Sequence, residues 1–323
     1  MGEAPVAELE AVLGGGSWDV GTSFEGAPGP SVPTRLGRNV CYVVLAVLFN
    51  EEDQVLLVQE AKAECHGKWY LPAGRMEPGE GIVAAMRREV KEETGLECEA
   101  LTLLALEERA PAWIRFAFLA RPTGGTLKTL AAADAESLQA TWWAGDPRAL
   151  PLRAPDILPL LELAARYRRS PPHPPVLPQP LPCAHLCLRL LVACANRAGH
   201  LWVLLGTAGT PHLPLVACGT APGQPRGGGG GLRLPVLRLL RDCLAQDPRP
   251  GPLGLLGLQH HPGGPGEGGD GVCFNVLLSI PEGSPGGAPP ELRCPELRWC
   301  QVEEGRLKGL ILQRLSATVP IRS

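Results

Sequence analysis

Hydrophobic residues in the first half of the chain fall into short runs that are typical of β-strands. Residues 39–50 (NVCYVVLAVLFN) and 55–61 (VLLVQEA) are two such runs, separated by the polar turn EEDQ. A short apolar run at residues 69–71 precedes a Pro/Gly loop, and two further runs follow at residues 97–110 and 112–122. Because aliphatic and aromatic side chains favour a pleated surface, the pattern predicts a sheet.

A different pattern lies between these strands and predicts a helix. Residues 81–94 (GIVAAMRREVKEET) consist mainly of good helix formers, and Gly95 follows where a helix favours a left-handed residue. A second amphipathic helix is expected within residues 150–169 (LPLRAPDILPLLELAARYRR). Strands combined with helices predict an α/β fold. The apolar face of the first helix comprises Ile82, Ala85, Met86 and Val90.

The predicted helix carries three glutamates on one face. Glu89, Glu92 and Glu93 stand at i, i+3 and i+4, so their carboxylates converge within about 5 to 6 Å at Cβ. The charge run alone favours a solvated face on which Arg88 and Lys91 relieve the repulsion. The alternative is a site for a hard divalent cation, which prefers carboxylate and carbonyl oxygens.

Proline and glycine divide the chain into parts. Residues 168–182 (RRSPPHPPVLPQPLP) cannot sustain a helix or a central strand and are predicted to be a semi-rigid linker. Residues 1–36 contain a short possible helix and Gly/Pro/Ser-rich segments, and we expect a mostly flexible lead-in. Two domains are therefore predicted, at residues 37–167 and 183–323.

The second half of the chain repeats the rhythm of the first. CLRLLVACANRAGHLWVLLG follows the pattern of CYVVLAVLFNEEDQVLLVQE, and RLPVLRLLRDCLAQDP follows that of the glutamate helix. In this alignment Ala245 and Gln246 stand at the positions of Glu92 and Glu93, and Pro248 replaces Gly95. The sequence therefore predicts a second, diverged copy of the first fold that has lost its carboxylates and is catalytically silent.

Composition limits the possible partners. The formal charge of the 323 residues is −3, so no basic surface for nucleic acid or an anionic membrane is indicated. The N-terminus lacks the pattern of a secretory signal, and no apolar run is long enough for a membrane span. The 11 cysteines are scattered without a CxxC pair, which favours reduced thiols and a cytosolic location. Cys183, His185 and Cys187 alternate as core-facing strand residues would, rather than as metal ligands.

One ordered set of residues resembles the signature of the Nudix hydrolases. Gly74, Glu80, the pair Arg88–Glu89, the pair Glu92–Glu93 and Gly95 stand at the spacing of that motif, with aliphatic Val90 and Leu96 at its apolar positions. The resemblance implies an α/β/α sandwich with a mixed sheet, followed here by the diverged Nudix-like domain. It also implies hydrolysis of a diphosphate with Mg²⁺ as cofactor and Mn²⁺ as a possible substitute.

The resemblance also assigns roles to the motif residues. It implies that Glu89, Glu92 and Glu93 are the metal-binding and catalytic glutamates, and we expect the Gly74 carbonyl as a further ligand. Glu80 and Arg88 are expected to form a structural ion pair that orients Glu89. The alternative for Arg88 is an ordinary surface arginine.

Residues outside the motif determine which group is attached to the diphosphate of the substrate. The approach to the motif resembles the MutT-related branch of the family, which implies cleavage of oxidised purine nucleoside diphosphates such as 8-oxo-dGDP and 8-oxo-GDP to monophosphate and phosphate. Trp69, Tyr70 and Asp156 are the candidate base contacts. The alternatives are a core role for Trp69 and a helix-capping role for Asp156.

Two other functions stay open at this point. One is hydrolysis of another nucleoside-diphosphate conjugate, and the other is a non-enzymatic nucleotide-binding module. The intact glutamates of the first copy argue against a pure binding module, because the second copy shows what their loss looks like. Oligomerisation through the second domain is a further possibility.

Overall fold

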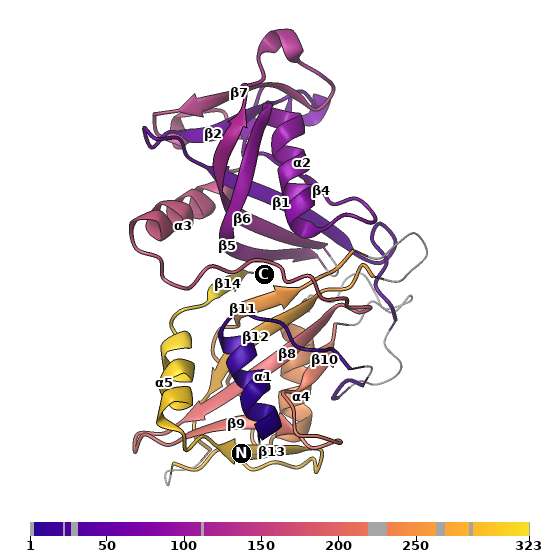
Figure 1. The fold of residues 1–323 in the computed structure, drawn as a ribbon, viewed down its shortest axis with the longest axis vertical. Coiled ribbons are helices and arrows are strands. Elements are labelled where there is room, and N and C mark those ends of the chain that lie inside the picture. The colour runs from indigo at the N-terminus through magenta and orange to yellow at the C-terminus, as the bar shows by residue number, and fades with distance from the viewer. Residues whose placement is uncertain are drawn as a thin grey trace.

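The computed structural model of the chain describes residues 3–21, 23–26, 32–110, 113–218, 231–262, 269–283 and 287–322. Residues 27–31, in the lead-in expected to be flexible, lie outside this range. Two α/β units lie end to end along the long axis of the molecule, and the N-terminal helix lies beside the second unit (Figure 1). The division into two successive α/β units follows the order predicted from the sequence.

The first unit is built on a mixed sheet in which the strand order is β5-β6-β1-β4. Strand β1 runs parallel to β6 and antiparallel to β4, and β5 runs antiparallel to β6. A smaller antiparallel sheet has the order β3-β2-β7. The strands are β1 (Cys41–Leu48), β2 (Val55–Glu60), β3 (Trp69–Tyr70), β4 (Ala73–Arg75), β5 (Leu96–Ala110), β6 (Trp113–Gly125) and β7 (Ser137–Trp143).

Two helices cover opposite faces of the main sheet. On β1, Val44 belongs to the apolar cluster that contains Met86 of α2, whereas Leu45 belongs to the cluster that contains Leu160 of α3. Alternate residues of a strand point to opposite faces, so burial on both faces explains the continuous apolar run of β1. The helices are α2 (Ile82–Thr94) and α3 (Leu158–Arg169), and the 3₁₀ turns are Ala63–Cys65, Leu130–Ala132, Pro147–Ala149 and Pro155–Ile157.

The second unit repeats the main features of this topology. Strand β8 is parallel to β12 and antiparallel to β10, as β1 is to β6 and β4, while β9 pairs with β13 as β2 pairs with β7. Helices α4 and α5 pack on opposite faces of β8. The elements are β8 (Cys187–Ala195), β9 (Leu201–Gly206), β10 (Leu215–Ala217), α4 (Arg233–Cys243), β11 (Gly254–Gln259), β12 (Cys273–Ile280), β13 (Leu297–Gln301), α5 (Gly305–Arg314) and β14 (Val319–Arg322).

The helix of the second copy is shorter than the sequence alignment implied. Helix α4 ends at Cys243, so Ala245 and Gln246, which the alignment placed on the helix, lie beyond its end. The Ala245 N–H donates instead to the carbonyl of Glu291, outside the helix. The backbone becomes extended at Leu244, with a φ of −91° and a ψ of 141°, so the helix ends before Pro248 can affect it.

The two sheets are joined by the C-terminal strand. Strand β14 is parallel to β5, where Ile321 faces Leu106, and antiparallel to β11, where Leu255 faces Val319. A single sheet of 11 strands therefore runs through the described part of both units. This shared sheet couples the units more tightly than a flexible connection between two domains would.

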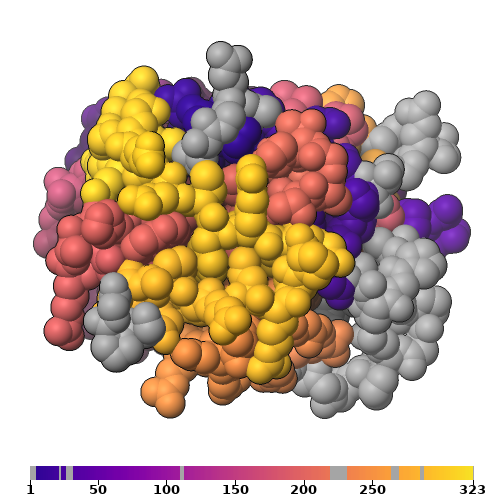
Figure 2. Space-filling view, turned by 90° about the horizontal axis from the view of Figure 1, so that it is seen from below, coloured from indigo at the N-terminus to yellow at the C-terminus, as the bar shows by residue number. Residues whose placement is uncertain are grey.

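The N-terminal segment is folded onto the second unit, in contrast to the flexible lead-in that the sequence suggested. Helix α1 (Glu3–Leu13) buries Leu9 and Val12 in the cluster of β8 and α5. Beyond the helix, the carbonyl oxygens of Trp18 and Asp19 accept hydrogen bonds from the buried Arg189. Seen from the end of the second unit, N-terminal residues lie at the rim of a face formed largely by C-terminal residues (Figure 2).

The proline-rich linker is also packed. The amide of Leu103 in β5 donates to the carbonyl of Val176, and the amide of Gln179 donates to the carbonyl of Leu258 in β11. Val176 is 2% exposed. Because these bonds connect the linker to both units, it forms part of their interface rather than a solvated spacer.

The remaining global predictions concern membranes and cysteines. In the described ranges, no helix is long and apolar enough to cross a membrane. All 11 cysteines are free, and Cys183 and Cys187 are buried, as the sequence predicted. Their sulfur atoms lie 3.8 Å apart.

Candidate functional site

Helix α2 carries the predicted carboxylates and ends at Gly95. This residue has a φ of 77°, and its N–H donates to the carbonyl of Lys91 at 2.9 Å. A Cβ at Gly95 would lie 2.2 Å from the carbonyl oxygen of Thr126. Both the left-handed backbone and the close approach of a neighbouring chain explain why glycine ends this helix.

Arg88 connects the loop before α2 to the carboxylates. Its Nε and Nη2 donate to the two carboxylate oxygens of Glu80 at 2.9 and 3.0 Å, which forms the predicted ion pair. Its Nη1 donates to Glu89 at 2.9 Å and to Glu92 at 3.0 Å. The hydrogen bonds to Glu80 and then to Glu89 raise the pKa of Arg88 far above its ordinary value despite partial burial. Arg88 is therefore a fixed element of the site.

Glu89 lies against the backbone of β4 at Gly74. A Cβ at Gly74 would lie only 2.0 Å from the carboxyl carbon of Glu89, so the absence of a side chain creates the space for this carboxylate. Glu89 is 7% exposed, and burial raises its pKa although Arg88 opposes the shift. The role of the Gly74 carbonyl as a ligand stays a prediction.

Glu93 is the most deeply buried of the three predicted glutamates. It is 4% exposed, and one carboxylate oxygen accepts a hydrogen bond from the Ala73 amide at 2.9 Å. Burial, with a smaller contribution from the charge of Glu89, raises the pKa of Glu93 to about 8. Burial and the repulsion from Glu89 thus both favour the protonated form of Glu93, and a neighbouring cation would oppose this shift.

A third carboxylate comes from a loop that the sequence did not single out. Ligand atoms of Glu89, Glu93 and Glu136 all lie within 4.8 Å of one another. Glu92 differs, because its side chain is 49% exposed and pairs with Arg88. The assignment of Glu92 as a ligand therefore stays a prediction, and Glu136 joins the candidate ligands.

Lys128 and Ser137 hold the loop of Glu136 against the end of α2. Lys128 is buried, and its Nζ donates to the carbonyl of Glu92, to Asp134 and to the hydroxyl of Ser137. The Ser137 hydroxyl donates in turn to the carbonyl of Glu93 at 3.2 Å. These bonds place Glu136 beside the helix, a position that depends on tertiary contacts and leaves no periodic signal in the sequence.

The donor set of this cluster fits a hard divalent cation. Mg²⁺ and Mn²⁺ prefer oxygen ligands and commonly bind through a few carboxylates while keeping waters for a phosphate substrate. Glu89 and Glu136 would complete such a site with Glu93. The burial of Glu89 and Glu93 costs free energy that a neighbouring cation would offset.

Tyr70 and Asp156, two of the predicted base contacts, are adjacent in the structure. The Tyr70 hydroxyl donates to Asp156 at 2.9 Å, and the buried Arg115 donates to Tyr70 at 2.7 Å and to Asp156 at 2.9 Å. Burial alone would raise the pKa of Asp156, but the charge and hydrogen bonds of Arg115 outweigh it and lower the pKa. Arg109 forms a further ion pair with Asp156. Asp156 is therefore an ionised acceptor and does not cap α3.

Arg115 was not among the predicted site residues, because its position beside Tyr70 and Asp156 depends on the register between β6 and β1. It lies in β6 beside Val43 of β1, and its guanidinium also donates to Glu107. Burial raises the pKa of Tyr70 to about 12, so its hydroxyl stays protonated.

Trp69 has a less direct relation to this polar group. It is half-buried, pairs with Gln59 on β2 and packs at the edge of the α3-side cluster. One face of the neighbouring Tyr70 ring is covered by the guanidinium of Arg153, 4.9 Å from its centroid. Base stacking on Trp69 or Tyr70 stays a prediction.

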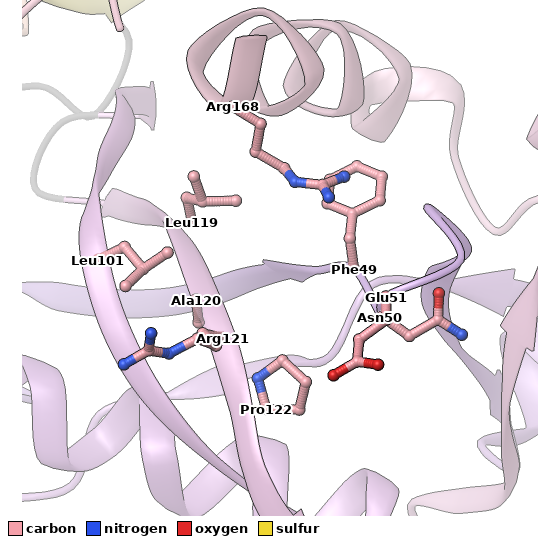
Figure 3. Close-up of a pocket in the computed structure, with 9 residues that line it drawn as sticks. All are labelled: Phe49, Asn50, Glu51, Leu101, Leu119, Ala120, Arg121, Pro122 and Arg168. Carbon is pink, nitrogen blue, oxygen red and sulfur yellow. The ribbon is translucent and has the colours of Figure 1, made fainter.

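A pocket of about 330 Å³ lies elsewhere on the first unit. It is bordered by apolar side chains and by Arg121 and Arg168, and the Arg168 guanidinium lies over the ring of Phe49 (Figure 3). None of the predicted site residues lines it. Both arginines already pair with carboxylates, Arg121 with Glu99 and Arg168 with Asp53.

The chain is similar in sequence to known proteins. The family model described as the NUDIX domain matches residues 41–156. The 8-oxo-dGDP phosphatase NUDT18 of Homo sapiens is 52% identical to the chain over 330 aligned positions, covering 99% of this chain and 98% of the human protein. The 8-oxo-dGDP phosphatase NUDT18 of Danio rerio is 42% identical over 98% of this chain and 96% of its own length.

Two solved structures resemble a smaller part of the chain. A Streptococcus suis ADP-ribose pyrophosphatase aligns with 40% of this chain and 92% of its own length, at 26% identity and a TM-score of 0.34. A NUDIX hydrolase from Nitrosomonas europaea aligns with 42% of this chain and 77% of its own length, at 26% identity and a TM-score of 0.36.

Proposed function

Because the chain belongs to the Nudix hydrolase family, we propose that it cleaves oxidised purine nucleoside diphosphates, such as 8-oxo-dGDP, to the monophosphate and phosphate. The observation that carries this proposal is the convergence of Glu89, Glu93 and Glu136 beside the glycine backbone of β4. Relatives similar to the chain over nearly its whole length are named 8-oxo-dGDP phosphatases, which supports the substrate class.

Nudix hydrolases generally need divalent cations, and Mg²⁺, with Mn²⁺ as a substitute, is the cofactor we propose. Glu89, Glu93 and Glu136 would hold it, with Glu92 and the Gly74 carbonyl as further candidate ligands. A bound divalent cation supplies positive charge that stabilises the developing charge on the diphosphate during attack by water.

The residues around this site have separable tasks. The Ala73 amide fixes one oxygen of Glu93, so the other oxygen is available to orient or accept a proton from water. Arg88 holds Glu89 in place through the ion pair with Glu80. In the reaction, oxygen of water bonds to phosphorus, the bridging P–O bond breaks, and the monophosphate leaves.

Base recognition is assigned to the group around Asp156. An ionised carboxylate only accepts hydrogen bonds, and an 8-oxopurine carries an N7–H donor that an unmodified purine lacks. Asp156, kept ionised by Arg115, is therefore suited to favour the oxidised base.

The second unit is proposed to be catalytically silent. Its α4 ends before the positions aligned with Glu92 and Glu93, and these are Ala245 and Gln246. In the described part of the chain, the one cluster of three metal-ligating side chains is that of Glu89, Glu93 and Glu136. The cation site therefore belongs to the first unit.

The decisive experiment is a substrate panel. The purified chain would be incubated in Mg²⁺ with dGDP, 8-oxo-dGDP, the matching triphosphates and ADP-ribose, and the products separated by ion-exchange chromatography. We expect 8-oxo-dGDP to give 8-oxo-dGMP and phosphate faster than dGDP gives dGMP. Preferred cleavage of ADP-ribose would indicate another conjugate as substrate, and no cleavage of any compound would indicate a binding module.

A matched pair of variants links this activity to the cluster. Glu93→Gln removes a buried carboxylate at nearly constant size, whereas Glu97→Gln alters an exposed residue that pairs with Lys91. Loss of most turnover is expected in the first variant, with wild-type turnover in the second.

A further inference from the structure

The loop between β4 and α2 contacts the second unit directly at one end and is connected to it through Tyr42 of β1 at the other. At one end, Nε2 of His260 lies 3.4 Å from the carbonyl oxygen of Glu80. At the other end, the Met76 amide donates to the carbonyl of Tyr42, whose hydroxyl donates to the carbonyl of Asp270 at 2.9 Å. His260 and Asp270 both belong to the connection between β11 and β12.

His260 is itself rigidly placed. It is 4% exposed, and its amide donates to the carbonyl of Gln179 in the linker at 2.9 Å. Its Nδ1 lies 3.0 Å from the carbonyl oxygen of Gly271. Each ring nitrogen thus faces a carbonyl oxygen, and a neutral ring, which carries one N–H, donates to Glu80 in the Nε2–H tautomer. A ring with so little freedom can transmit its position to the loop.

Two successive hydrogen-bonded pairs, Glu80 with Arg88 and Arg88 with Glu89, connect the His260 contact to the carboxylate cluster. Glu80, whose carbonyl meets His260, binds Arg88 through both of its carboxylate oxygens. Arg88 then donates to Glu89, a member of the cluster, and to Glu92. A shift of the loop would therefore move Glu89 through Arg88, since the guanidinium is planar and its hydrogen bonds have fixed geometry.

We propose that His260, a residue of the catalytically silent unit, is a positioning residue for the cation site of the first unit. It acts through the loop of residues 76–81 and touches neither the substrate nor the cluster. The kinetic test of this proposal rests on the proposed function, whereas the hydrogen-exchange test depends only on the contacts of the loop. This role would explain why a unit that has lost its own carboxylates still contributes to the enzyme.

The test compares three substitutions at His260 with one at its neighbour. His260→Ala removes the ring, His260→Phe keeps the ring without a donor, and His260→Gln keeps a donor of similar reach. His261→Ala is the matched control, because His261 is exposed and its ring contacts only the carbonyl of Pro262 among the described hydrogen bonds.

Two readouts separate positioning from a general loss of structure. Removing a group that orients metal ligands typically weakens metal affinity about 10- to 100-fold. His260 contacts Glu80 and is therefore farther from the ligands than such a group, so we expect the half-saturating Mg²⁺ concentration to rise about three- to tenfold in His260→Ala. Turnover at saturating Mg²⁺ should fall less. Hydrogen exchange of the amides of Glu77 and of residues 79–81 should accelerate in His260→Ala and His260→Phe, while His260→Gln stays closer to the wild type.

The outcomes test the proposed function and the positioning role of His260 separately. If the wild type fails to cleave any diphosphate, the proposed function is wrong, and hydrogen exchange still tests the contact. If the wild type is active and His260→Ala keeps both its Mg²⁺ dependence and its loop exchange, the positioning role is wrong. Equal effects of His261→Ala and His260→Ala, or slowed turnover with unchanged Mg²⁺ dependence and loop exchange, would also overturn it.

Discussion

Substitution of Gly74 tests the geometry of the site with little disturbance of the fold. In Gly74→Ala the new Cβ would lie 2.0 Å from the carboxyl carbon of Glu89 and 2.1 Å from each of its oxygens. Non-bonded carbon atoms approach to about 3.5 Å, so the carboxylate must retreat by about 1.5 Å. The obstructed atoms form the far end of a flexible side chain, which can rotate away at small cost in stability.

The displacement is expected to affect chemistry far more than folding. A misplacement of about 1 Å at a reacting centre can cost on the order of 100-fold in rate, so we expect turnover of 8-oxo-dGDP to fall by about that factor in Gly74→Ala. The unfolding temperature should change by only a few degrees, since no buried group is lost. Phosphate release in excess Mg²⁺ and circular dichroism during heating measure the two quantities.

A matched glycine provides the control. Gly309 lies in α5 of the second unit, and a Cβ there would meet no atom within 4 Å. Gly309→Ala should therefore leave turnover near the wild-type rate. Wild-type turnover in Gly74→Ala, or equal losses in both variants, would refute the assignment of Gly74 as the space for Glu89.

Three further substitutions probe other parts of the structure. Gly95→Ala meets a left-handed backbone and the Thr126 carbonyl, so urea denaturation should show a loss of more than about 1 kcal/mol in unfolding free energy; an unchanged value contradicts this. In Glu108→Gln, stability should approach or exceed that of the wild type as pH rises. Burial raises the pKa of Glu108 above its ordinary 4.5. Glu108 therefore stabilises the folded wild type below pH 4.5, and this stabilisation is lost as the pH rises through the raised pKa. Urea denaturation of both proteins at pH 4.5 and 7.5 checks this, and the opposite trend contradicts it. Asp156→Asn should reduce the preference for 8-oxo-dGDP over dGDP in kcat/KM, whereas an unchanged ratio would remove Asp156 from base recognition.

Local rules account for the parts of the site that the sequence predicted. Helix propensity and the position of Gly95 specify α2, and the spacing of the glutamates on it follows from helical geometry. The ion pair between Glu80 and Arg88 is present as the motif implied. The mixed sheet and the repeated topology were also predictable, because strand rhythm and helix position recur in both halves.

Tertiary contacts account for what the sequence did not predict. Glu136 reaches the cluster through Lys128 and Ser137, whose bonds connect segments far from α2 in the chain. Arg115 joins the base-side group because β6 is in register with β1. The same holds for α1, whose apolar residues are buried only when the second unit is present.

The end of α4 illustrates the limit of an alignment without structure. The aligned positions of Glu92 and Glu93 suggested a retained helix with substituted carboxylates. In the structure the backbone leaves the helix after Cys243, so Ala245 and Gln246 are not helical. The second unit therefore differs from the first in backbone as well as in side chains.

Direct measurement of cation binding tests the central claim most sharply. Mn²⁺ binding can be followed by electron paramagnetic resonance in the wild type, Glu93→Gln, Glu136→Gln and the exposed-site control Glu97→Gln. We predict that the wild type and Glu97→Gln bind with equal affinity, and that Glu93→Gln and Glu136→Gln each bind at least about tenfold more weakly, since each loses one carboxylate of the cluster. Wild-type affinity in both cluster variants would contradict the assignment of this cluster as the cation site.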